Sequence, residues 1–415
     1  VGLLCDAFAD EEFCRALVGA FQQSGEIPFG EGRLKFSRIS ALKDLLKDPA
    51  SQLTISRPGI EGSATAVIIG DGLFLKAYRL LQEGTNPELE MGRYLTEIFP
   101  YPHAVPLAGA LEYQKPDGRS ATLALLQGYV KNQGDVWSYT QKYLERFFED
   151  SLVAPPEERV PPSGDSHGAF LMLMETLGRR TGELHQALSR KTDDPAFDPE
   201  PIGLADLSAW KGRVIDDALL TLGRLEQRLD ALAEPARARA QTLLGKRALL
   251  LDRIRALEFK GLGAVKTRFH GDYHLGQVLL AESDFIIVGF EGEPARPVAE
   301  RRAKSSPLRD VAGMLRSFDY AARAALNVFT ALRPADLVFL EPLARDWQQR
   351  SAQAFLQGYE KTVKGCLAYP DRPEHAHSLI ELFGLEKILY EIRYELDNRP
   401  EWTAVPLASL LEQLP

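Results

Sequence analysis

The segment HGDYHLGQ at 270–277 holds the side chains of this chain that are best suited to chemistry. Asp272 can accept a proton from a hydroxyl group, and the amide oxygen of Gln277 can bind a magnesium ion. The sequence DFIIVGFEGEP follows at 284–294 and is an apolar run that ends in two more carboxylates. A proton acceptor with oxygen ligands for magnesium nearby is what phosphoryl transfer requires.

One position of the apolar run does not fit this chemistry. Where a metal-binding Asp would be expected, the chain has Gly289. A zinc site is the alternative, because His270 and His274 have the i, i+4 spacing of a zinc-binding pair. However, Gly271 favours a loop, and no Glu lies between the two histidines as it does in HExxH. We therefore interpret the segment as a loop in which Asp272 is the proton acceptor.

A β-hairpin is predicted further upstream, where Thr65–Ile69 and the run Leu73 to Lys76 flank a Gly-Asp-Gly turn. Period-two alternation places Phe74 and Lys76 on one face and Leu73, Leu75 and Ala77 on the other. A lone Lys at the end of a strand is usually solvated, but here a predicted helix from Pro87 to Phe99 brings Glu90 as a candidate partner. Protein kinases hold ATP phosphates with such a pair.

Two further strands are predicted at Leu107–Tyr113 and Thr122–Val130, and a helix follows at Trp137–Asp150. This change from strand to helix marks the boundary between two lobes. From Ala169 onward, three-to-four spacing of apolar residues predicts mainly helices. These are expected at Ala169–Leu188, Leu204–Leu232, Pro235–Glu258, Asp310–Leu332, Pro342–Lys361 and Glu374–Asp397, and short strands at Gln277–Leu280 and Phe285–Val288 interrupt them.

The composition narrows the class of protein. The 415 residues include 49 Lys and Arg against 58 Asp and Glu, a formal net charge of −9, which argues against nucleic acid or an anionic membrane as a partner. The 3 cysteines form no close metal-type pair, which fits the cytoplasm. We find no signal peptide and no apolar stretch of roughly 18 residues. Because the chain begins with Val rather than Met, we expect either a trimmed product or a piece of a longer polypeptide, and we favour the second.

The chain resembles the maltokinases, which are ATP-dependent relatives of the aminoglycoside and choline kinases, and the resemblance covers nearly its whole length. It is carried by FHGDYHLGQVLL (269–280), FEGEPARPVAERRAKSSPLRDVAGMLRSFDYAA (290–322), YEIRYELDNRP (390–400), LKAYRLLQEGTNPELEMGRYL (75–95) and LALLQGYVKNQGDVW (123–137). The first twenty residues also resemble the start of the kinase domain in fusions of trehalose synthase with maltokinase.

This resemblance implies that ATP and Mg²⁺ are used to convert maltose to α-maltose 1-phosphate, in the route from trehalose to α-glucan, with trehalose synthase as a fused or associated partner. Asp272 matches the catalytic base, Lys76 the phosphate-binding lysine and Glu90 its helix partner. The expected magnesium ligands are Gln277 and Glu291. The strand Leu123–Val130 matches the adenine-binding hinge, and the nucleotide contacts expected there are Gln127, Tyr129 and Val130.

Two departures from the family pattern concern the nucleotide. Relatives have Asp where this chain has Gly289, so Glu291 or Glu293 would have to take over, or the protein is a catalytically impaired variant. The segment EGSATA at 61–66, which includes Ser63 and should lie over the phosphates, reads EQSNTS in relatives. It offers fewer side-chain donors here, and weaker ATP binding is expected.

The C-terminal stretch 390–399 reads equally as one amphipathic face of a terminal helix or as a sugar site. Tyr rings, a guanidinium group and an amide suit a disaccharide, through stacking and fixed hydrogen bonds. The resemblance favours maltose contacts, and the expected residues are His274, Tyr390, Glu391, Arg393, Tyr394 and Asn398. The basic run at 296–309 is interpreted as a solvated surface.

The predicted fold is therefore α+β and protein-kinase-like. It comprises an N-terminal cap at 1–60, a β-rich nucleotide-binding lobe at 61–133 and a larger helical lobe at 134–415. Two other functions stay open at this point. One is a kinase of another small hydroxylated substrate, such as an aminoglycoside. The other is a pseudokinase-like module that binds maltose or supports trehalose synthase.

Overall fold

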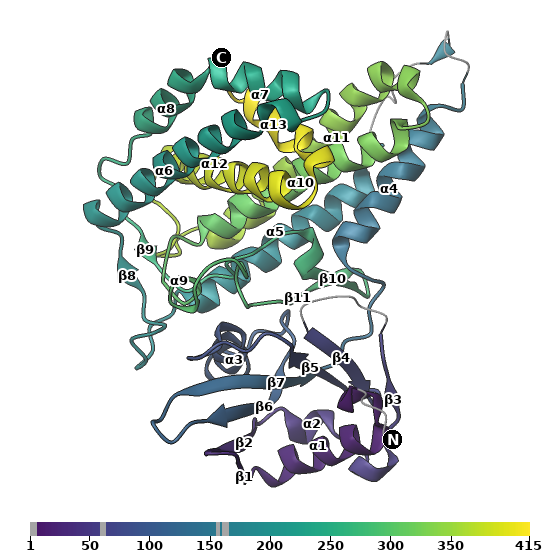
Figure 1. The fold of residues 1–415 in the computed structure, drawn as a ribbon, viewed down its shortest axis with the longest axis vertical. Coiled ribbons are helices and arrows are strands. Elements are labelled where there is room, and N and C mark those ends of the chain that lie inside the picture. Colours follow the sequence, from purple (N-terminus) through teal and green to yellow (C-terminus); the bar gives the residue numbers. More distant parts are fainter. Residues whose placement is uncertain (1–5, 59–63, 155–157, 160–165) are drawn as a thin grey trace. The chain divides into compact units, whose positions relative to one another are not determined.

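The computed structural model describes residues 6–58, 64–154, 158–159 and 166–415 (Figure 1). The chain forms two compact units. The first comprises the described residues up to Gln133 together with Leu279–Glu282 and Ile286–Ala303, and the second comprises the remainder, from Gly134 onward. Among the described residues, no helix has the length and apolar character needed to cross a bilayer.

The first unit is built on a seven-stranded antiparallel sheet with the order β1-β2-β6-β7-β5-β4-β3. Its strands are β1 (Glu26–Phe29), β2 (Gly32–Arg38), β3 (Ile55–Ser56), β4 (Ala64–Ile69), β5 (Leu73–Tyr78), β6 (Leu107–Gln114) and β7 (Ser120–Gly128). Strands from the expected cap at 1–60 thus lie in the same sheet as the strands of the nucleotide-binding lobe. In the described residues, the cap is not a separate domain.

Alternation along the strands gives this sheet two apolar faces, as period-two geometry requires. On one face Val18 and Phe21 of α1 (Glu11–Gln23) belong to the same buried cluster as Leu75 and Leu126 of the sheet. On the other face α3 (Pro87–Arg93) contributes Leu89, which clusters with residues such as Leu125. Helices therefore cover both faces of the sheet (Figure 1). The helix predicted at Pro87–Phe99 continues beyond α3 as a π-helical segment, Tyr94–Ile98.

The second unit is mainly helical (Figure 1). Its principal helices are α4 (Val136–Ser151), α5 (Gly168–Leu188), α6 (Leu204–Arg228), α7 (Ala236–Gly245), α8 (Arg247–Ala256), α10 (Leu308–Thr330), α11 (Leu337–Val363), α12 (Pro373–Asn398) and α13 (Ala404–Glu412). The single helix predicted at Pro235–Glu258 is in fact two helices, α7 and α8. The short strands predicted after the HGD loop form a hairpin of β10 (Val278–Ala281) and β11 (Asp284–Ile287).

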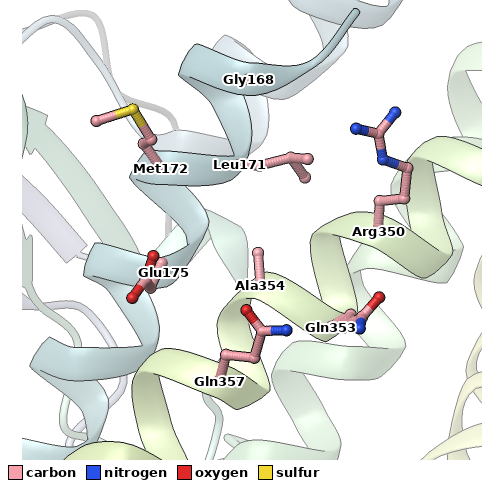
Figure 2. Close-up of a pocket in the computed structure, with 8 residues that line it drawn as sticks. All are labelled: Gly168, Leu171, Met172, Glu175, Arg350, Gln353, Ala354 and Gln357. Carbon is pink, nitrogen blue, oxygen red and sulfur yellow. The ribbon is translucent and has the colours of Figure 1, made fainter. Parts of the chain in front are cut away.

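Helices α5 and α11 cross in very close contact because each has a glycine at the crossing. A Cβ atom on Gly178 would lie 1.9 Å from the carbonyl oxygen of Phe355, and one on Gly358 would lie 2.0 Å from that of Glu175. Beside the crossing, a pocket of about 310 Å³ opens between the same two helices (Figure 2). Its lining includes polar side chains from both helices, such as Glu175 and Arg350.

Candidate active site

Lys76 lies on β5 on the face opposite the buried Leu73 and Leu75, as the alternation predicts. Its ammonium group lies 2.8 Å from Oε2 of Glu88 in α3 and also forms an ion pair with Glu291. The side chains of Lys76 and Glu88 are only 17% and 3% exposed. A buried charge pair of this kind needs further hydrogen bonds to be tolerated.

Glu88 receives these additional hydrogen bonds from two residues of the sheet. The hydroxyl of Tyr78 donates to Glu88 at 2.6 Å, and Nε2 of Gln127 donates at 3.2 Å. Burial by itself raises the pKa of Glu88, but the neighbouring ammonium of Lys76 and these donors lower it overall. Glu88 is thus held as a carboxylate in a fixed position.

Glu90, the helix partner expected for Lys76, does not contact it. Its carboxylate receives two hydrogen bonds from the guanidinium group of Arg302, at 2.6 and 3.0 Å. Glu90 cannot face Lys76 when Glu88 does, because residues two apart on an α-helix point in directions about 200° apart. Glu88 faces the sheet, and Glu90 instead ties α3 to the segment that follows the FEGEP sequence.

Gly289 and Glu291 lie in the turn after β11. Gly289 has a φ of +77°, a conformation that most side chains disfavour but that Asp tolerates better than most. Burial raises the pKa of Glu291, and repulsion from Glu88 raises it further, although Lys76 opposes both effects. Two carboxylates share one ammonium group here, so the cluster has an excess of negative charge that a cation would offset.

The hinge residues that were expected to contact the nucleotide form hydrogen bonds within the protein. Gln127 is buried and donates to Glu88, so its side chain supports the Lys76 cluster. The backbone N–H of Tyr129 donates to the carbonyl of Gly72 at 2.8 Å, and the carbonyl of Val130 accepts from the side chain of Asn132. Ser63 lies outside the described residues.

In the second unit, a buried network fixes the HGD loop. One oxygen of Asp310 accepts from the backbone N–H of His270 at 2.8 Å and the other accepts from that of Gly271 at 3.0 Å. Nε2 of His185 lies 3.1 Å from the same carboxylate, and its Nδ1 lies 2.9 Å from the hydroxyl of Tyr359. Asp310 and His185 are 2% and 1% exposed, so the loop is anchored from the protein interior.

This anchored loop presents Asp272 next to α12. Oδ1 of Asp272 lies 3.1 Å from Nζ of Lys387, and Oδ2 lies 3.9 Å from Nε2 of His274. Burial lowers the pKa of His274, and the positive charge of Lys387 lowers it too, while Asp272 acts in the opposite sense. The result is a carboxylate beside a neutral imidazole. The same loop runs on into the 3-10 turn Leu275–Gln277, which carries the expected magnesium ligand Gln277.

Tyr390 and Glu391 lie on α12 one turn after Lys387. The ring of Tyr390 stacks with that of Tyr394 at 6.1 Å between centroids. Glu391 pairs at 2.7 Å with Arg316, which also pairs with Asp319 at 2.8 Å. Burial raises the pKa of Glu391, and Arg316 opposes this shift. Of the residues expected to contact the sugar, Tyr390 and Glu391 thus lie on the helix that contacts Asp272.

Arg393 does not join this group. It pairs with Asp217 of α6 at 2.9 Å and donates to the hydroxyl of Thr221 at 2.8 Å, so it holds α12 against α6. Asn398 is exposed and donates to the carbonyl of Tyr394, which keeps its amide within its own helix. The structure therefore separates Arg393 from the other expected maltose contacts.

Several site residues were missed by the sequence reasoning, and they share one property: each acts on a predicted site residue from another element. They are Glu88, Asp310, Arg316 and Lys387. Glu88 could have been considered, because it lies two positions before Glu90 on the same predicted helix. Lys387 lies one helical turn before Glu391, which is a weaker signal. Nothing local marks Asp310 as the partner of a loop forty positions earlier.

Comparisons with known proteins complete this description. No protein-family model matches the chain. A glucosamine kinase of Mycolicibacterium smegmatis is 25% identical over 358 residues, which covers 85% of this chain and 77% of the relative. A glucosamine kinase of Streptacidiphilus jiangxiensis is 27% identical over 300 residues, which covers 71% of this chain but only 58% of the relative.

Solved structures show the same fold. A glucosamine kinase in complex with glucosamine, ADP and inorganic phosphate has a TM-score of 0.67 and 21% identity, and the match covers 97% of this chain and 83% of that one. A second crystal form of a glucosamine kinase also gives a TM-score of 0.67. The predicted α+β fold, with a β-rich unit and a larger helical unit, is confirmed.

Proposed function

We propose that this chain is a maltokinase, which transfers the γ-phosphate of ATP to the anomeric hydroxyl of maltose and forms α-maltose 1-phosphate. One observation carries the proposal: the carboxylate of Asp272, on a loop anchored by Asp310, lies beside the helix that bears Tyr390 and Glu391. The similarity to named glucosamine kinases supports phosphate transfer from ATP to a sugar.

The charges around Asp272 favour a neutral sugar over glucosamine. An ammonium group on the substrate would seek a carboxylate that has no cation of its own. Asp272 is already beside Lys387, and Glu391 is beside Arg316. Lys387 would also repel a positively charged amino sugar. Both considerations support maltose, whose hydroxyl groups carry no charge.

In the proposed reaction, Asp272 accepts the proton of the anomeric hydroxyl as the oxygen attacks the γ-phosphorus of ATP, the bond from that phosphorus to the β,γ-bridging oxygen breaks, and ADP leaves. Transfer of this proton to a positioned carboxylate contributes a rate factor of about 10²–10⁴ in enzymes of many classes. His274, kept neutral by its surroundings, can exchange a hydrogen bond with a sugar hydroxyl. Lys76, fixed by Glu88, supplies a positive charge for the phosphates of ATP.

The residues present also fit a magnesium ion. Mg²⁺ in phosphate-transfer sites binds one or two protein oxygens and otherwise substrate phosphates and water. Glu291 would hold the ion, and the excess negative charge of the cluster formed by Lys76, Glu88 and Glu291 supports this role. Gln277 is the second ligand in this proposal, and its support is the sequence resemblance. When bound, the ion would neutralise charge that develops on the phosphates. The proposal further includes a cytoplasmic location and trehalose synthase as partner, for which the sequence resemblance is the support.

The test is to incubate the chain with ATP and Mg²⁺ and with maltose, glucosamine, glucose or an aminoglycoside, and to follow sugar phosphates by ³¹P NMR. We expect α-maltose 1-phosphate to form, and Asp272→Asn to form none. A preference for glucosamine or for an aminoglycoside would overturn the assignment of maltose. Absence of any product from every acceptor, in this chain and in Gly289→Asp, would overturn the assignment as a kinase.

A further inference from the structure

Lys387 is a charged residue at the candidate reaction centre that belongs to a different element from the HGD loop. It lies in α12, and its Nζ is 3.1 Å from Oδ1 of Asp272. The side chains of Lys387 and Asp272 are 20% and 19% exposed, so the ion pair is largely shielded from water. An ion pair in such surroundings is stronger and more sharply oriented than one on the surface.

We propose that Lys387 is a positioning residue for phosphoryl transfer, which orients the carboxylate of Asp272. This inference rests on the proposed function, because it assigns Lys387 a part in the reaction of Asp272. It adds a cation from α12 to a loop that Asp310 also holds in place.

The two oxygens of Asp272 are in different surroundings. Oδ1 accepts a hydrogen bond from Lys387. Oδ2 lies 3.9 Å from His274, which is beyond hydrogen-bond distance, so it stays open to a hydroxyl group. A carboxylate that is fixed through one oxygen presents the other in a defined direction, and such orientation is a large part of what an enzyme contributes to proton transfer.

The position of Lys387 on α12 links this orientation to the sugar. Its Nζ lies 5.0 Å from the ring centroid of Tyr390, within the range of a cation–π contact. Glu391 follows one turn later and pairs with Arg316. The same helix, α12, would therefore contact the sugar through Tyr390 or Glu391 and orient Asp272 through Lys387. A sugar that binds without contacting α12 should be phosphorylated slowly.

The experiment compares Lys387→Met, Lys387→Arg and a control, Lys211→Met, in steady-state kinetics with maltose and ATP. Lys211 is a lysine of α6 that donates to the backbone carbonyls of Arg255 and Leu257. For Lys387→Met we expect kcat to fall by about tenfold to a hundredfold, as part of the effect of general-base catalysis. KM for ATP should change by less than about twofold, because the proposed role affects the chemical step and not the binding of ATP.

A positioning role can be separated from a merely structural one by the conservative variant and by the kinetic parameter that changes. Lys387→Met should lower kcat and leave KM for ATP nearly unchanged, because the loss concerns the orientation of the reacting carboxylate. Lys387→Arg, which keeps a charged donor at this position, should retain most of the rate. Lys211→Met should leave both kcat and KM unchanged, and thermal unfolding of each variant shows whether it is folded.

The two ideas fail in different ways. If the unmodified chain is active and Lys387→Met has the same kcat, the inference about Lys387 is overturned and the proposed function stands. If Lys387→Met and Lys387→Arg lose activity equally, Lys387 is structural and the inference is overturned. If the unmodified chain phosphorylates no acceptor, the proposed function fails, and the role of Lys387 fails with it.

Discussion

The ammonium group of Lys76 lies 2.8 Å from the carboxylate of Glu88, while Glu90, two positions further along the same helix, pairs with Arg302. Two glutamates of the same short helix therefore have different partners. Glu88 fixes the lysine proposed to bind phosphate, and Glu90 fixes the helix. This difference can be tested directly, because each residue is a matched control for the other.

We expect Glu88→Gln to lower kcat/KM for ATP by about tenfold to a hundredfold, because a hydrogen bond to a charged group is worth about 1.5–3 kcal/mol. Glu90→Gln should keep kcat/KM for ATP within about threefold, since the pair of Glu90 and Arg302 is part-exposed and weaker. Steady-state kinetics at saturating maltose measures both. Equal losses in the two variants would contradict the assignment of Glu88.

Asp272→Asn is expected to reduce kcat by about 10²–10⁴, the range of general-base contributions. The amide keeps the size of the side chain but accepts no proton, so maltose affinity should change little. Isothermal titration with maltose, beside turnover with ATP, separates the two effects. Turnover at the normal rate would remove Asp272 from the mechanism.

Asp310→Asn should weaken the hydrogen bonds that hold the HGD loop. The carboxylate accepts from two backbone N–H groups and lies beside His185, and an amide has only one oxygen to offer. We expect a loss of about 1–3 kcal/mol in the free energy of unfolding, the cost of an unsatisfied buried group. Urea denaturation measures it, and kcat should fall with it. Tyr359→Phe, which removes the outermost hydroxyl of the network, should cost less, and the reverse order would contradict the proposed anchoring.

Gly289→Asp and Glu291→Gln test the proposed magnesium site. An Asp at 289 adds a carboxylate, at a strain of about 1–2 kcal/mol for a side chain at positive φ. We expect Gly289→Asp to tighten Mg²⁺-dependent nucleotide binding and Glu291→Gln to weaken it, because the amide has no charge to offer the ion. Titration of a fluorescent ATP analogue at several Mg²⁺ concentrations measures both. Unchanged Mg²⁺ dependence in Glu291→Gln would exclude Glu291 as a ligand.

The lowered pKa of His274 predicts a pH dependence of stability. In the unfolded chain the imidazole takes up a proton below its ordinary pKa of about 6.5, whereas in the folded chain it resists protonation. The unfolded state then binds more protons, so the free energy of unfolding falls as the pH drops below about 6.5. His274→Gln should lose this component. Urea denaturation of both proteins at several pH values from 7.5 to 5 tests it, and parallel curves would contradict the shift.

The elements that place the candidate site were largely predictable. The strand of Lys76, the helix of Glu88 and the helix of Tyr390 follow from period-two and three-to-four spacing, and their observed bounds differ by a few residues from the prediction. The division of Pro235–Glu258 into two helices was missed, because apolar spacing continues across the break. The pairing of strands from 1–60 with those of the nucleotide-binding lobe was not predicted, because pairing between distant strands leaves no local pattern.

Local sequence determined which functional groups are present and on which kind of element. They are a carboxylate on a glycine-containing loop, a lysine at the end of a strand, and aromatic and charged groups on one helix. Tertiary structure decided which of these groups meet. Glu88 faces Lys76 because of the rotation of α3 against the sheet, and Arg393 faces α6 because of the rotation of α12. Asp310 and Lys387 reach the loop around Asp272 from sequence positions far away. Helical phase and packing set these directions, and a single sequence records neither until the chain is folded.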